Sequence, residues 1–138
     1  MYYVSYGKPS KISNVLMDKV VAFAADFLEI DEDLEVDFEE KFEENCCGWC
    51  DYDEDGITVF VNPKMKKSQI ITTFFHEMVH AKQFVKGELI SGEGRNPSRW
   101  FGKECDLPYF ETPWEQEAYE LEAVMWDIFK KDVNWLCL

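Results

Sequence analysis

The chain has 138 residues, of which 46% are apolar, a size and composition that suit one folded domain with a buried core. Its 28 acidic and 14 basic side chains give a formal net charge of −14. Such a charge repels phosphate groups, so the composition speaks against binding to nucleic acids and to anionic membranes. We therefore expect one domain over residues 1–138.

The apolar runs and the cysteines indicate a reduced, cytoplasmic protein. The longest apolar run, residues 20–25, is far shorter than the about 20 residues that span a bilayer. The first residues lack the basic segment and apolar stretch of a secretory signal. An odd number of cysteines cannot all pair within one chain; they are Cys46, Cys47, Cys50, Cys105 and Cys137. Cys47 and Cys50 have the spacing of half a structural zinc site, but without a second close pair we expect free thiols near a turn.

The first half of the chain predicts one helix and three strands. Apolar residues at spacings of three and four predict a helix over residues 10–30, capped by Ser10 or Ser13. Apolar and polar residues alternate over 34–39, which predicts a strand with one buried face, and a second short strand is expected at 48–52. After a turn rich in aspartate, β-branched residues predict a strand over 57–61.

The second half predicts two helices separated by a long loop. Helical periodicity runs from residue 68 to 86 and stops at Gly87. Residues 88–112 are predicted to be a loop, and a loop of this length in a small domain is usually functional or mobile. Pro113 begins a helix that runs to residue 131. The predicted fold is α+β, with a helix, a small antiparallel β-meander, a helix, a long loop and a helix.

Both histidines of the chain lie in one short segment of the second predicted helix. His76 and His80 are four residues apart, and Glu77 follows the first of them. On a helix this spacing puts both imidazoles on one face, from which they can bind one Zn²⁺ ion. Glu77 points about 100° away from that face and can reach a water activated by the metal. The alternative is a pair of surface histidines on an amphipathic helix.

A catalytic zinc ion needs a third protein ligand, and the last predicted helix offers several carboxylates. Glu117 is our first choice because it heads an apolar stripe that we expect to face the core. The members of that stripe are Leu121, Val124 and Ile128. On a helical projection of this segment, Glu115 and Glu122 lie on the side opposite to the stripe and are predicted to be solvated. Glu120 lies nearer to the stripe and is the reserve candidate for the third ligand. Alternatively, Glu117 is a first-turn residue favoured only by the helix dipole.

Two motifs together resemble the gluzincin zinc metallopeptidases. One is the segment from His76 to Gln83, and the other is Tyr109 followed by Pro-Trp-Glu-x-Glu-Ala at 113–118. More narrowly, the chain is similar to the single-domain minigluzincins and to small metallopeptidase-like proteins of phages. The resemblance implies a minimal zincin-like fold, one catalytic Zn²⁺ and a glutamate ligand on the following helix, which matches Glu117. It also implies a polypeptide substrate, and location in the host cytoplasm if a phage encodes the chain.

The expected function is therefore a zinc-dependent metallopeptidase with endopeptidase-like activity, in which Glu77 is the general base. Well-studied gluzincins use a further His or Tyr to stabilise the oxyanion. With both histidines assigned to the metal, Tyr109 is our first choice, ahead of Tyr119, Arg95 and Arg99.

Two other functions remain open. The chain could be a non-catalytic zinc scaffold or a regulatory module that docks a partner through aromatic residues such as Trp100, Phe101 and Trp114. It could also hold a closed structural zinc ion with Cys105 as the fourth ligand. Glu77 favours the enzyme, because a structural site needs no general base.

Overall fold

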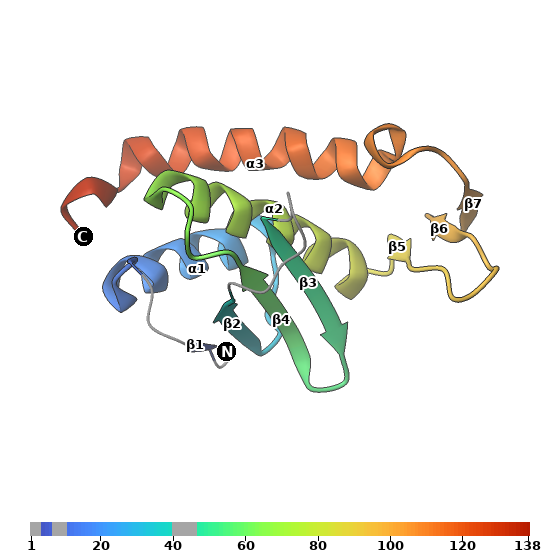
Figure 1. Cartoon of the computed structure of the whole chain (residues 1–138), viewed down its shortest axis with the longest axis horizontal. Coiled ribbons are helices and arrows are strands. Elements are labelled where there is room, and N and C mark those ends of the chain that lie inside the picture. Colours follow the sequence, from blue (N-terminus) through green and yellow to red (C-terminus); the bar gives the residue numbers. More distant parts are fainter. Residues whose placement is uncertain (1–3, 7–10, 40–46) are drawn as a thin grey trace.

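The computed structural model describes residues 4–6, 11–39 and 47–138. Three helices and two small sheets make up the described part, so the expected α+β class is confirmed. The helices are α1 (Asn14–Leu28), α2 (Lys67–Val85) and α3 (Pro113–Asp132). Helix α2 lies in the middle, with α3 on one side and the strands β3 and β4 on the other (Figure 1).

The larger sheet has the strand order β1-β2-β4-β3. Its strands are β1 (Val4–Tyr6), β2 (Leu34–Phe38), β3 (Gly48–Asp53) and β4 (Gly56–Val61). The predicted antiparallel meander is wrong, because β1 pairs with β2 and β2 with β4 in parallel, and only β3 and β4 are antiparallel. The alternating buried residues of β2 and β4 explain this order, since two strands with a strongly apolar face share the centre of the sheet. The more exposed β3 takes an edge position among the described strands.

Helix α1 begins and ends with defined caps. The side chain of Ser13 accepts a hydrogen bond from the backbone N–H of Leu16 at 3.2 Å, so the second of the two expected capping residues is the one used. The helix ends at Glu29, whose left-handed conformation (φ 56°) lets its N–H bond the carbonyls of Ala25 and Asp26. Helix α1 is therefore shorter at both ends than the predicted range 10–30.

Helix α3 packs with a different face from the one predicted. Val124 and Ile128, expected in the core, are 43% and 37% exposed. The buried residues of the helix follow a three–four spacing that starts two residues earlier, and they are Glu115, Ala118, Met125 and Phe129. Phe129 decides this orientation, because its ring packs edge-on against Phe75 at 5.7 Å between centroids.

Residues 88–112 contain regular structure instead of one continuous loop. They form a three-stranded antiparallel sheet of β5 (Leu89–Ile90), β6 (Ser98–Trp100) and β7 (Lys103–Cys105), followed by a 3-10 turn η1 (Tyr109–Glu111). Strands of two or three residues are too short to produce a periodicity signal. This small sheet follows the C-terminal end of α2 and projects from the body of the molecule (Figure 1).

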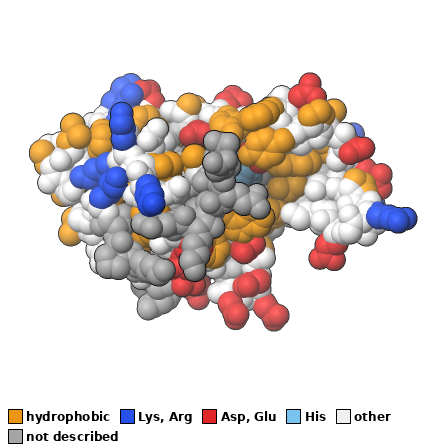
Figure 2. Space-filling view, viewed as in Figure 1, with side chains coloured by type: hydrophobic (Ala, Val, Ile, Leu, Met, Phe, Trp, Pro, Cys, Tyr) orange, Lys and Arg blue, Asp and Glu red, His pale blue; other side chains and the backbone are white. Residues whose placement is uncertain are grey.

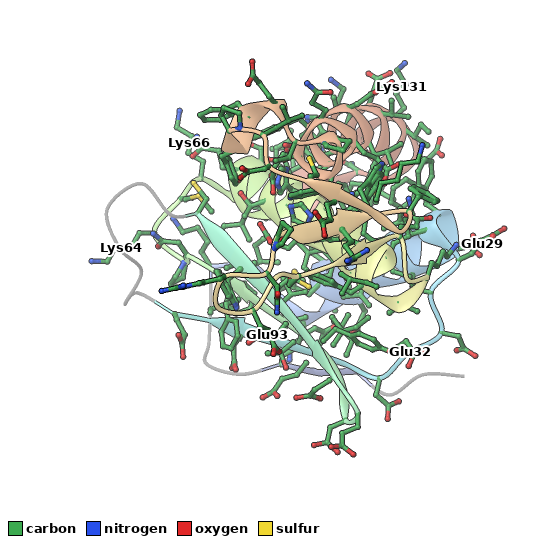
Figure 3. All side chains as sticks on the ribbon, turned by 90° about the vertical axis from the view of Figure 1, so that its right-hand side faces the viewer. Glu29, Glu32, Lys64, Lys66, Glu93 and Lys131 are labelled. Atoms are coloured by element: carbon green, nitrogen blue, oxygen red, sulfur yellow. The ribbon has the colours of Figure 1, made fainter. Side chains whose placement is uncertain are left out.

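Charged side chains cover much of the outside of this framework. In Figure 3 the labelled residues Glu29, Lys64 and Lys131 extend outward from the ribbon. No helix in the described ranges combines the length and the hydrophobicity that crossing a membrane requires.

Candidate metal centre

Helices α2 and α3 bring two histidines and one glutamate together in the interior. His76 and His80 lie one turn apart on α2, and Glu115 lies in the first turn of α3. The Nε2 atom of His76 is 3.0 Å from Oε1 of Glu115, and the Nε2 atom of His80 is 2.9 Å from Oε2 of the same carboxylate. All three residues are buried, and their donor atoms lie within 4.8 Å of one another. This group is able to hold a metal ion.

The structure brings Glu115 to the histidines, where the sequence had favoured Glu117. Glu115 is only 5% exposed, so the prediction that it is solvated is wrong. The Oε1 atom of Glu117 lies instead 2.6 Å from Nζ of Lys82 and 3.1 Å from Nε2 of Gln83. Glu120, the reserve candidate, is exposed. The physical reason is the orientation of α3, whose buried face begins at Glu115. The spacing from Glu115 to Ala118, Met125 and Phe129 was the signal in the sequence that would have identified it.

Two further side chains contact the ring nitrogens that face away from Glu115. The Nδ1 atom of His76 is 3.0 Å from Oε1 of Glu122, and the Nδ1 atom of His80 is 2.8 Å from Oε1 of Gln83. Glu122 had been predicted to be solvated, but its side chain is largely buried. Partners of this kind fix the tautomer and the orientation of histidines that bind metals.

The carboxylates make the site favourable for positive charge. Burial lowers the pKa of His76, but its hydrogen bonds with Glu115 and Glu122 outweigh burial and raise that pKa to about 9. The pKa of His80 is raised in the same way, against the effect of burial. Burial raises the pKa of Glu115, but its contacts with both histidines outweigh it and lower this pKa to about 2. A cation bound between these groups would be stabilised by the same electrostatics.

Glu77 lies next to the metal-binding group without belonging to it. Its side chain is 9% exposed and lines the pocket in front of the histidines. Its pKa is raised, chiefly by burial. Strand β3 passes very close to it: a Cβ atom at Gly48 would lie 3.1 Å from Cγ of Glu77 and 2.7 Å from Cγ2 of Thr73. Glycine at position 48 therefore lets β3 approach the helix at the site.

A pocket of about 720 Å³ opens onto the candidate site. His80, Glu77 and Glu115 line it from the helices, and β3, the start of the small sheet and α3 supply the other walls. Its large apolar side chains are Trp49, Tyr52, Phe84, Leu89, Ile90 and Trp114. Figure 2 shows histidine in a hollow surrounded by hydrophobic side chains. The pocket thus joins a polar floor to apolar walls, as ligand sites usually do.

Tyr109 reaches this site, as an oxyanion-stabilising residue would have to. Its hydroxyl donates a hydrogen bond to Oε1 of Glu115 at 3.0 Å, and its side chain lines the pocket. Burial and the neighbouring carboxylate of Glu115 raise the pKa of Tyr109, so it remains a hydrogen-bond donor at neutral pH. Tyr119 is also close, with its ring centroid 4.6 Å from that of His76.

The other candidates from the sequence lie elsewhere. Arg99 pairs with Glu104 on the exposed small sheet, and neither it nor Arg95 lines the pocket. Cys105 lies in β7 and is not part of the metal-binding group found among the described residues. Cys46 lies outside the described residues, and Cys47 and Cys50 are free thiols.

Comparison with known proteins identifies no relative: no protein-family model, no curated protein and no solved structure matches this chain.

Proposed function

We propose that this chain is a zinc-dependent metallopeptidase of the gluzincin type, in which His76, His80 and Glu115 bind the metal and Glu77 is the general base. One observation carries the proposal. A buried His-His-Glu group lies beside a second acidic residue, Glu77, that does not belong to it, and His80, Glu115 and Glu77 all line one pocket. A site that served only to bind a metal would not need the additional carboxylate.

The donor set supports zinc as the metal. Two imidazole nitrogens and one carboxylate are the ligands of many catalytic zinc sites, whereas structural sites usually have four protein ligands. When bound, Zn²⁺ supplies Lewis-acid chemistry, polarising a carbonyl group and lowering the pKa of water. The protein supplies the rest of the proposed reaction.

Glu77 moves the proton in this proposal. Its carboxylate accepts a proton from the attacking water and returns it to the nitrogen of the leaving amine. Burial beside the pocket suits this role, because the carboxylate is shielded from bulk solvent there. The hydroxyl of Tyr109, which donates to Glu115 in the described structure, lies at the same site and would turn toward the substrate to stabilise the oxyanion that develops there.

The position of β3 supports a polypeptide as the substrate. Among the described strands β3 is an edge of the larger sheet, and its residues 48–52 line the pocket. An edge strand offers backbone donors and acceptors to an extended chain. The apolar walls would then contact the side chains of that chain.

A non-catalytic docking module is the second candidate, and the exposed aromatic residues favour it. Phe101 and Phe110 are 63% and 73% exposed, which is unusual for phenylalanine. Trp100 and Trp114, in contrast, lie partly buried against each other with their ring centroids 6.2 Å apart. A docking surface would therefore centre on the phenylalanines and leave both tryptophans in structural roles.

The test of the proposal is hydrolysis of an unfolded polypeptide by the zinc-loaded chain. In water enriched in ¹⁸O, cleavage should place the heavy isotope in new carboxyl termini, detected by mass spectrometry. A chelator should stop cleavage, and zinc should restore it. Stoichiometric zinc binding without cleavage of a diverse peptide mixture would contradict the peptidase and favour the docking module.

A further inference from the structure

Gln83 is the buried polar residue that connects His80 to the neighbouring helix. It lies one turn after His80 on α2 and is 0% exposed. Its Oε1 atom is 2.8 Å from Nδ1 of His80. Its Nε2 atom donates to the backbone carbonyl of Trp114 at 3.0 Å and to Oε1 of Glu117 at 3.1 Å. One amide therefore bridges a candidate metal ligand and the first turns of α3.

These contacts fix which way the amide of Gln83 points. The carbonyl of Trp114 and the carboxylate of Glu117 can only accept hydrogen bonds, so the NH₂ group must face them. The amide oxygen must then face His80, and it can only accept. The proton that the His80 ring keeps when it binds a metal is consequently held on Nδ1. This leaves Nε2, which lies 2.9 Å from Oε2 of Glu115, as the nitrogen that would bind the ion.

Glu117 is in turn held in place by a lysine. The Nζ atom of Lys82 is 2.6 Å from Oε1 of Glu117 and 2.8 Å from Oε1 of Glu88. Lys82 precedes Gln83 on α2, so two consecutive side chains of this helix contact the carboxylate of Glu117. This ion pair keeps the carboxylate oriented toward the amide of Gln83.

We propose that Gln83 and Glu117 are positioning residues that act in series: Glu117 orients the amide of Gln83, and Gln83 holds His80 in the tautomer that can bind metal. The inference rests on the proposed metal site. It gives the two histidines different supports, a neutral amide for His80 and the carboxylate of Glu122 for His76. Glu117 then contributes to metal binding through two other side chains and without touching the ion.

The test compares zinc affinity and the His80 ring proton in four variants. Gln83→Leu removes the acceptor and Glu117→Leu removes the orienting carboxylate, whereas Glu117→Gln keeps an acceptor oxygen. Glu120→Leu, at an exposed position of the same helix, is the matched control. Zinc affinity is measured by competition with a chromogenic chelator. With only two histidines in the chain, ¹⁵N NMR of the zinc-loaded protein resolves each ring, and the exchange of the Nδ1 proton with water can be followed.

Loss of a partner that orients a metal-binding histidine typically lowers metal affinity by about 10- to 100-fold, and we expect this for Gln83→Leu. The Nδ1 proton of His80 should exchange faster in that variant, while that of His76 stays unchanged. Glu117→Leu should show both effects more weakly, with affinity lowered by about tenfold. Glu117→Gln should restore affinity to near that of the parent, and Glu120→Leu should match the parent in both measurements.

A purely structural role would lower the melting temperature and leave both zinc affinity and proton exchange unchanged, and that result would overturn the inference. If Gln83→Leu does not fold, the comparison of Glu117→Leu with Glu117→Gln decides, since Glu117 is only half-buried. Equal affinities in that pair would also overturn it, as would a parent that binds no zinc. A parent that binds zinc and cleaves nothing contradicts the proposed peptidase alone, because neither measurement requires turnover.

Discussion

The Oε1 atom of Glu122 lies 3.0 Å from Nδ1 of His76, on the opposite side of the ring from Glu115, whose Oε1 atom lies 3.0 Å from Nε2. Two carboxylates of α3, two turns apart, thus hold one imidazole of α2 between them. Helix α3 therefore supplies both the candidate metal ligand Glu115 and the residue that orients His76, Glu122. Any rotation of α3 about its axis would move both carboxylates away from the ring together.

Removing the support of His76 should weaken zinc binding while the candidate ligands stay in place. We expect Glu122→Leu to lower zinc affinity by about 10- to 100-fold, because the ring loses the partner that orients it. Glu122→Gln keeps an acceptor oxygen and should lose less. Chelator competition measures both, with Glu120→Leu as the exposed control. Identical affinities for parent and Glu122→Leu would show that Glu115 alone positions the ring.

Glu115→Ala and Glu117→Ala separate the candidate ligand from the residue that the sequence had favoured. Because Glu115 contacts both histidines, its removal should release zinc at chelator concentrations that the parent tolerates. Glu117→Ala should retain the metal better, since it acts through Gln83. Zinc binding should also raise the melting temperature of the parent, and this gain should disappear in Glu115→Ala. The reverse order of zinc retention would return the ligand role to Glu117.

Glu77→Gln tests the general base separately from metal binding. The substitution keeps the size of the side chain and removes the proton acceptor, so we expect kcat to fall by about 10²- to 10⁴-fold. Zinc content and melting temperature should equal those of the parent, because Glu77 is outside the metal-binding group. A variant that cleaves as fast as the parent would exclude Glu77 as the base.

Tyr109→Phe tests the proposed oxyanion donor. Loss of one such donor typically lowers kcat by about 10²- to 10³-fold, and we expect KM to change much less. Tyr119→Phe is the matched control, because this second tyrosine lies beside Tyr109 and against the His76 ring but does not line the pocket. Equal effects of the two substitutions on kcat would argue against a specific role for Tyr109.

Phe129→Ala and Val124→Ala test the orientation of α3 without reference to the metal. Phe129 is fully buried against Phe75 and Phe23, and truncating such a ring typically costs about 3–5 kcal/mol of unfolding free energy. Val124 is 43% exposed, so its truncation should cost less than about 1 kcal/mol. Urea denaturation measures both, and comparable losses would restore the helix face predicted from sequence.

The positions of the main elements and the two histidines could be read from the sequence because these signals are local. The predicted helix at 68–86 differs from α2 by one residue at each end, and the predicted helix at 113–131 differs from α3 by one residue at its C-terminal end. Whether Glu115 or Glu117 faces the histidines could not be decided from local sequence signals. These residues lie two positions apart, about 200° around a helix, so a small error in choosing the apolar stripe exchanges the buried and the exposed carboxylate.

That choice depends on contacts between distant segments. Leu121, Val124 and Ile128 form a plausible apolar stripe by themselves, and only the packing of Phe129 against α1 and α2 shows that another face is buried. The pairing of β2 with β4 also depends on a contact between distant segments, because the alternation of apolar and polar residues within one strand does not show which strand it pairs with. The small sheet was missed for a different reason, since its strands are too short to carry a pattern.

The small sheet and its first connection supply Leu89, Ile90, Ser91 and Ser98 to the pocket, yet no residue of 88–112 belongs to the hydrophobic core cluster. Its longest connection, residues 91–97, is exposed throughout. Changes of sequence or length there would act on the pocket wall next to Ser91 at little expense to the core, provided that Gly92 is kept, because a Cβ atom at Gly92 would lie 2.1 Å from the backbone oxygen of Asn96. The metal-binding group and α2, in contrast, are under strict packing constraints. Divergence among descendants of this chain would then be concentrated in that segment, and ligand preference could drift without loss of the fold.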